Sequence, residues 1–192
     1  MTITEQKIGG YSGVNAPGVL NLYVIDRKEV LSVLDPARHR IPGGAVSVVP
    51  AGGVVLNRGA MITKMKFPPL QCSYIQTMER TDGGLISKPV IEFQVPASRK
   101  DLIDFYNVHY QKQFVCLVED ANRQAYIMGN EERGLRMQLS QSVNSVNTHL
   151  ITFSGSFANP SFLLETSAAG LVLADHFRDT DFSIDFSLDF NA

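Results

Sequence analysis

The residues that could carry out chemistry are few and lie scattered along the chain. Its 192 residues include four histidines (His39, His109, His149 and His176), and no two of them have the HxxxH spacing of a metal site. Cys72 and Cys116 are too far apart in the sequence for a CxxC site, so we expect two small buried apolar side chains. The chain has neither a GxSxG nucleophile elbow nor a GxxxxGK[ST] phosphate loop. The sequence therefore predicts a protein that is not an enzyme and that holds no metal or cofactor.

The aspartates near the C-terminus offer oxygen ligands of the kind that calcium takes. In DTDFSIDFSLDFNA, however, Asp181, Asp185 and Asp189 are four residues apart. On a strand that rises about 3.3 Å per residue, neighbouring carboxylates would lie about 13 Å apart, too far for one ion. We therefore do not expect a calcium site.

The same segment alternates strictly between polar and large apolar residues, as a strand with two different faces does. The apolar residues are Phe182, Ile184, Phe186, Leu188 and Phe190. Leaving this face in water forfeits about 1.5–3 kcal/mol for each large side chain that could be buried. The strand is therefore expected to complete a sheet, either that of its own subunit or that of a neighbouring copy. We favour the neighbouring copy.

The composition is that of a globular protein made in a cytoplasm. The chain is 44% hydrophobic and 19% charged, with no apolar run long enough to span a membrane and no signal peptide at MTITEQKIGG. Five basic residues and no acidic one lie between Pro36 and Met78: Arg38, Arg40, Arg58, Lys64 and Lys66. Six acidic residues and one basic residue follow Met137. This asymmetry favours head-to-tail contact between copies, although ordinary solvated faces explain the basic part equally well.

The pattern of apolar residues and turns predicts a mainly β protein, a sandwich or barrel with one flanking helix at about residues 98–110. Residues 1–18 are expected to form a flexible arm, residues 19–178 the domain and residues 179–192 a C-terminal strand or arm. Residues 19–25 are typical of a strand, and residues 26–36 of a short helical turn that Asp26 caps and Pro36 ends. The helix is expected to begin at Ser98 and to place Leu102 and Phe105 on its apolar face.

Glycine-rich turns predict several hairpins. The pairs Gly43–Gly44 and Gly52–Gly53 each introduce a short valine run, and the turn at residues 81–84 separates two long strands. Pro89, inside the second of these strands, predicts an edge position or a bulge. Further strands are expected at residues 114–120, 125–129, 134–140 and 149–157, and residues 162–165 and 170–177 are expected to continue the sheet.

The run LIDFYNVHYQKQFVCLVEDANRQAYIMGNEERGLRMQ, followed by HLITFSGSFANPSF, resembles the tail-tube and head-to-tail connector proteins of tailed bacteriophages. The shared pattern is a helix, a strand, a turn with Asp and Asn, a strand that ends in Gly, a strand after Gly-Leu and a last strand with Thr-Phe-x-Gly. It covers roughly residues 98–162, about a third of the chain.

This resemblance implies a non-enzymatic subunit that closes into rings, typically hexameric, in a virion made in the host cytoplasm. Its partners would be other copies and neighbouring virion proteins, with no membrane contact. Gly43, Gly44, Gly52 and Gly53 would shape a long hairpin that joins neighbouring subunits. The acidic face formed by Asp181, Asp185 and Asp189 would line a lumen through which DNA passes without specific binding.

A second class of function fits a β-sandwich as well. The chain could be a monomeric module that binds carbohydrate or protein. Such modules commonly stack sugar rings on exposed aromatic side chains, and this chain has six tyrosines but no tryptophan. We expect most of the tyrosine rings to be buried, with their hydroxyls reaching water.

Overall fold

The computed structural model describes residues 17–36, 47–68, 70–82, 84–96, 100–143 and 147–165. These residues are mainly β with one α-helix, α1 (Lys100–His109), which confirms the predicted fold class. Residues 1–16 of the arm expected at residues 1–18, the pair Gly43–Gly44, the strand expected at residues 170–177 and the C-terminal segment 179–192 lie outside the described residues.

The larger sheet contains a path of seven antiparallel strands with a short branch. In spatial order the path is β6 (Cys72–Thr81), β7 (Gly84–Pro96), β11 (Asn147–Ser154), β10 (Leu135–Val143), β8 (Gln113–Asp120), β1 (Val19–Asp26) and β5 (Ile62–Lys66). The branch leaves β8 through β9 (Ala125–Met128), β12 (Phe162–Leu164) and β3 (Val48–Val49). A second sheet pairs β2 (Val30–Val33) with β4 (Val54–Leu56).

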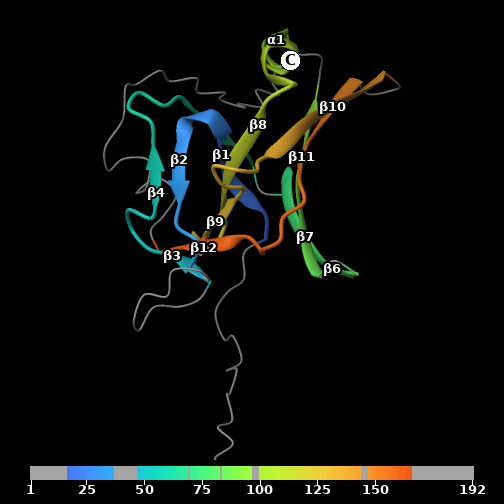
Figure 1. Ribbon diagram of the computed structural model, residues 1–192. Coiled ribbons are helices and arrows are strands. Elements are labelled where there is room, and N and C mark those ends of the chain that lie inside the picture. Colours follow the sequence, from blue (N-terminus) through green and yellow to red (C-terminus); the bar gives the residue numbers. More distant parts are fainter. Residues whose placement is uncertain are drawn as a thin grey trace, which may run out of the picture.

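The path bends where β8 meets β10, because these strands share only the pairs Leu135–Phe114 and Arg136–Gln113. The bend folds the sheet into two halves that face each other. Figure 1 shows β10, β11, β7 and β6 on one side of β1 and β8, and the small sheet of β2 and β4 on the other side. The described residues thus form three β layers.

Two apolar cores separate these layers, and β1 and β8 contribute to both. Leu22 and Val24 of β1 face the core between the two halves of the large sheet, whereas Tyr23 and Ile25 face the core under β2 and β4. Strands buried on both faces appear in the sequence as continuous apolar runs, which is the pattern of FVCLV and, apart from Asn21, of VLNLYVI. Leu102 of α1 is buried in the first core, so the predicted apolar face of the helix is confirmed.

The segment after Asp26 departs from the prediction. The Asp26 carboxylate accepts a hydrogen bond from the Lys28 amide at 3.1 Å, as a cap does, but the helical turn is only a 3-10 turn, Arg27–Glu29. Strand β2 follows directly, so the helix expected to reach Pro36 is wrong. Val30 and Val33 are buried in the second core, and this packing favours a strand over the local helical signal.

The hairpin expected around Gly52–Gly53 is also wrong. The flanking strands do not pair with each other: β3 pairs in parallel with β12, and β4 pairs with β2. Gly52 has a φ of +79°, which suits glycine, and the Gly53 amide donates to the Pro50 carbonyl at 2.9 Å. The turn therefore passes the chain from one sheet to the other.

The other two predicted hairpins are confirmed, β6 with β7 and β8 with β9. Pro89 does not lie on an edge strand, because β7 pairs with both β6 and β11. Pairing with β11 ends at Val90, and the Pro89 carbonyl then accepts a hydrogen bond from the Gly155 amide at 3.4 Å. The strand tolerates a residue without an N–H at this point because the regular ladder has already ended.

Candidate assembly surface

The β6–β7 hairpin extends beyond the apolar core. At its base, Cys72 pairs with Phe93 and both side chains are buried. Every residue of β6 from Thr77 to Thr81 is exposed, as are Gly84 and Leu85 across the turn. In Figure 1 this end of the hairpin lies at the lower right, away from β1 and β8. We call residues 76–88 the β6–β7 arm.

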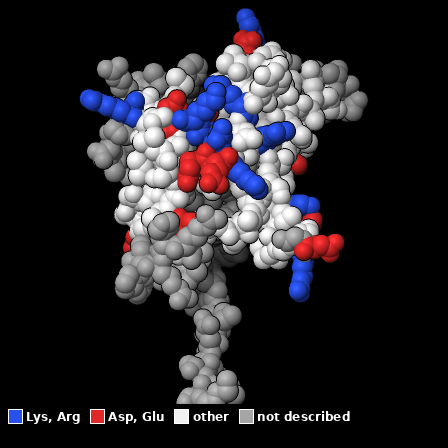
Figure 2. All heavy atoms as spheres, in the orientation of Figure 1, with Lys and Arg blue, Asp and Glu red and all other residues white. Residues whose placement is uncertain are grey.

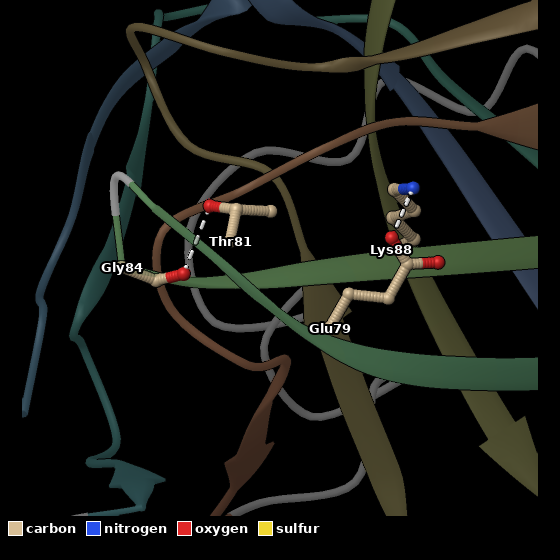
Figure 3. Close-up of polar contacts among 4 residues, drawn as sticks. All are labelled: Glu79, Thr81, Gly84 and Lys88. Atoms are coloured by element: carbon tan, nitrogen blue, oxygen red, sulfur yellow. Dashed lines mark hydrogen bonds and ion pairs between the residues drawn. The ribbon is translucent and has the colours of Figure 1, made fainter.

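Main-chain pairing holds the arm in shape up to its turn. The register runs without interruption to Thr81 and Gly84, and Gly84 has a φ of +118°. Figure 3 shows the Thr81 hydroxyl donating to the Gly84 carbonyl at 3.0 Å and the Lys88 ammonium paired with the Glu79 carboxylate at 2.6 Å. Both charged side chains are about half exposed, so this ion pair contributes little, at most about 1 kcal/mol.

One face of the arm continues the face that builds the core. Cys72 and Ile91 point into the core at the base of the hairpin. Further out on the same face, Met78 is 40% exposed and Leu85 is 52% exposed. Ile75 is exposed on the opposite face. Exposed apolar side chains on a projecting edge strand are a liability for a monomer, and a protein partner would cover them.

The seven-strand path ends in two edges, β6 and β5. Among the described residues, β6 pairs with β7 alone and β5 pairs with β1 alone. The edge at β5 is basic, because Lys64 and Lys66 lie on it. The Lys64 ammonium is 5.2 Å from the centre of the Tyr23 ring. Burial, and secondarily the charge of Glu119, raises the pKa of Tyr23 to about 12.

The structure does not bring the predicted contact residues together. Gly52 and Gly53 lie between β3 and β4, in the turn that joins the two sheets, and not on the arm. The pair Gly43–Gly44 and the alternating residues 181–190 lie outside the described part of the chain. The sequence predicted the hairpin at residues 72–96 but not its projection. Its signal is the stretch QTMERT, in which both faces of β6 carry polar residues and Met78 is the one apolar residue.

Among the described residues, the side chains that could carry out chemistry are packed into the fold and do not form a common site. Burial raises the pKa of the Cys72 thiol to about 12, and burial also raises the pKa of Cys116, so both stay protonated near neutral pH. His109 packs against the Phe105 ring at 4.6 Å, and burial, with the nearby Lys112 charge, lowers its pKa. No group of three or more metal-ligating side chains occurs among the described residues. No helix in that part of the chain is long and apolar enough to cross a membrane.

A cavity of about 270 Å³ lies between the β9–β10 loop and the segment that leads into β12. Several of its polar groups are hydrogen-bonded to one another or to neighbouring residues. The Asn159 amide donates to Asp35 at 2.9 Å, the Glu131 carboxylate accepts from the Val33 amide at 3.0 Å, and the Arg27 guanidinium donates to the Glu131 carbonyl at 2.8 Å. These hydrogen bonds fix the cavity walls.

Charges of both signs are mixed on the face shown in Figure 2, and no continuous basic surface covers it. The arm also carries both signs, with Glu79, Arg80, Asp82 and Lys88. A surface of this kind does not attract a phosphate backbone strongly. No protein-family model, curated protein or solved structure matches this chain. Its function must therefore be argued from its own residues.

Proposed function

We propose that this protein is a non-enzymatic structural subunit of a tailed-phage particle. Copies associate into rings, with six subunits as the expected number, that form the tail tube or the head-to-tail connector. The rings act as a conduit that DNA crosses without specific binding, and they contact neighbouring virion proteins.

The observation that carries the proposal is the β6–β7 arm. It continues a core-forming face into solvent, where Met78 and Leu85 are about half exposed. It also presents β6 as an edge strand, which pairs only with β7 among the described residues. Strand edges and apolar side chains that lie together in this way are typical of surfaces that bind another protein chain.

The order of elements supports the phage assignment. The resemblance over residues 98–162 requires a helix followed by four strands, and α1, β8, β9, β10 and β11 follow in that order. The Asp-Asn turn of the pattern is the β8–β9 turn, where the Asp120 carboxylate accepts hydrogen bonds from the amides of Asn122 and Gln124 at 2.9 and 2.8 Å.

Native mass spectrometry and negative-stain microscopy of the purified chain test the proposal. We expect rings or stacked rings whose mass is a multiple of the 21.1 kDa chain. A chain that remains monomeric at high concentration would contradict the proposal.

The cavity beside β12 favours a second candidate, a monomeric module that binds a small ligand such as a sugar. Its volume of about 270 Å³ is just below the range of small-molecule pockets, about 300–1,000 Å³. A glycan array distinguishes the two. Specific binding by a monomer, abolished by Asn159→Ala but not by the arm substitution Met78→Thr, would favour the binding module.

A further inference from the structure

The edge at β5 has two chemically different sides. Thr63 and Met65 pair with Val24 and Leu22 and share their side, which faces the core between the two halves of the large sheet. Lys64 and Lys66 pair with Tyr23 and Asn21 and lie on the other side. A strand added to this edge would therefore meet an apolar side and a basic side in alternation.

Exposed apolar side chains flank this edge. Met61, directly before β5, is 64% exposed, and Leu70, shortly after it, is 73% exposed. Between β5 and Leu70, Phe67 is buried, with its ring 4.8 Å from the ring of Phe93. Leu70 has a φ of +71°, in the turn where the Gln71 amide donates to the Pro68 carbonyl at 3.3 Å. The backbone here holds a large apolar residue where turns favour glycine, and it displays that residue to solvent.

The basic side of the edge is only partly neutralised by the protein itself. The Lys64 ammonium lies over the Tyr23 ring, a neutral partner. Lys66 is exposed and sits opposite Asn21, whose amide donates to the Glu119 carboxylate at 2.9 Å on the next strand. Among the described residues, the nearest acidic group of this row is thus two strands away and is already hydrogen-bonded to Asn21. Within that part of the chain, both positive charges of this edge are without an acidic partner.

Residues 181–190 carry the complementary pattern. Their polar positions include Asp181, Asp185 and Asp189, and every alternate position is Phe, Ile or Leu. The other open edge does not match as well, because the exposed half of β6 carries one acid, Glu79, and one base, Arg80. The segment between Glu165 and Asp181 spans up to about 53 Å when extended, enough to reach a second subunit.

We propose that residues 181–190 of a neighbouring copy add to the β5 edge as an extra strand, with the aspartates on the side of Lys64 and Lys66 and the apolar side chains on the side of Met65. This inference rests on the proposed function and adds a second contact between subunits, besides the contact made by the arm. It places the three aspartates at a subunit contact and not on the lining of a lumen.

Reciprocal charge reversal in full-length chains tests the pairing. One variant carries Lys64→Glu and Lys66→Glu, and the other carries Asp181→Lys, Asp185→Lys and Asp189→Lys. Each variant alone is expected to need about tenfold more protein for ring formation than the wild type. A 1:1 mixture is expected to recover ring formation, because each defective edge then meets a tail of opposite charge. Arg136→Glu, exposed on β10 and outside both the arm and the β5 edge, is the matched control and should assemble like the wild type.

Circular dichroism and thermal melting establish that each variant is folded, and Lys64→Gln with Lys66→Gln replaces the reversal if it is not. A third chain carries both sets of substitutions. If this chain forms rings but the 1:1 mixture does not, the tail pairs with its own subunit, and that result would overturn the inference. Unimpaired assembly of either variant alone would overturn it too. In both cases wild-type rings would leave the proposed function standing, whereas a monomeric wild type would refute that function itself.

Discussion

The double substitution Met78→Thr and Leu85→Thr separates assembly from folding. Both side chains lie on the core-forming face of the arm but beyond the core, about half exposed. Threonine keeps the β propensity of the strands while it removes most of the apolar surface. The substitution should therefore weaken any contact that covers this face and leave the folded subunit intact.

The expected size of the effect follows from the exposed fractions. Full burial of a Met or Leu side chain contributes about 1.5–3 kcal/mol, so covering the exposed half contributes about 1 kcal/mol for each residue. Together they predict a loss of about 2 kcal/mol per contact, which weakens each subunit contact about 30-fold. By the same arithmetic the halves already covered in the subunit contribute to folding, so the free energy of unfolding should fall by at most about 2 kcal/mol.

Sedimentation velocity over a concentration series measures assembly, and urea denaturation measures subunit stability. Val108→Thr is the matched control, because Val108 is 68% exposed on α1, away from the arm. Wild-type assembly by the double variant would refute the role of the arm. A loss of stability well above about 2 kcal/mol would show instead that these side chains belong to the folded core.

Four further substitutions test the fold itself. Phe93→Ala removes a ring packed against Phe67 and Phe153 at 4.8 and 6.5 Å and should lower the free energy of unfolding in urea by about 3–5 kcal/mol; a loss below about 1 kcal/mol would contradict the core described above. Gly134→Ala places a Cβ 2.7 Å from the Phe114 carbonyl oxygen, beside the β8–β10 bend, and should abolish cooperative thermal unfolding or sharply lower its midpoint temperature. At Gly59 nothing lies within 4 Å of an added Cβ, so Gly59→Ser should destabilise the fold only through the local φ of +84°. Burial raises the pKa of Tyr23 to about 12, above the ordinary 10.0, so its contribution to stability is complete below pH 10 and is lost as the pH rises to 12. The Tyr23→Phe chain should therefore lose less stability than the wild type between pH 10 and pH 12. It should still lose some stability, because the Cys72 thiol titrates in an overlapping range.

Local sequence signals predicted the elements that are formed by residues close together in the chain, such as tight turns and hairpins. The β8–β9 turn is an example, because Asp120 supplies both acceptor bonds and Arg123 adopts a φ of +62° within four residues of the strand end. The double burial of β1 and β8 also appears directly as continuous apolar runs. Such features need no knowledge of distant residues.

The pairing of the short strands could not be predicted, because it is decided by distant residues. β3 pairs with β12, more than a hundred residues away, and β4 pairs with β2 although Gly52–Gly53 stands in a position typical of a hairpin. Residues 30–33 form a strand because Val30 and Val33 are buried under the second sheet. The arm was missed for a related reason: whether Met78 is buried depends on where the other half of the sheet ends.

The mass of the wild-type particle in solution tests the central claim most directly. Native mass spectrometry of the wild type beside the Met78→Thr and Leu85→Thr variant should show a closed ring of fixed subunit number for the first and mainly 21.1 kDa chains for the second. A single peak at the mass of one chain for the wild type, at every concentration, would contradict the account.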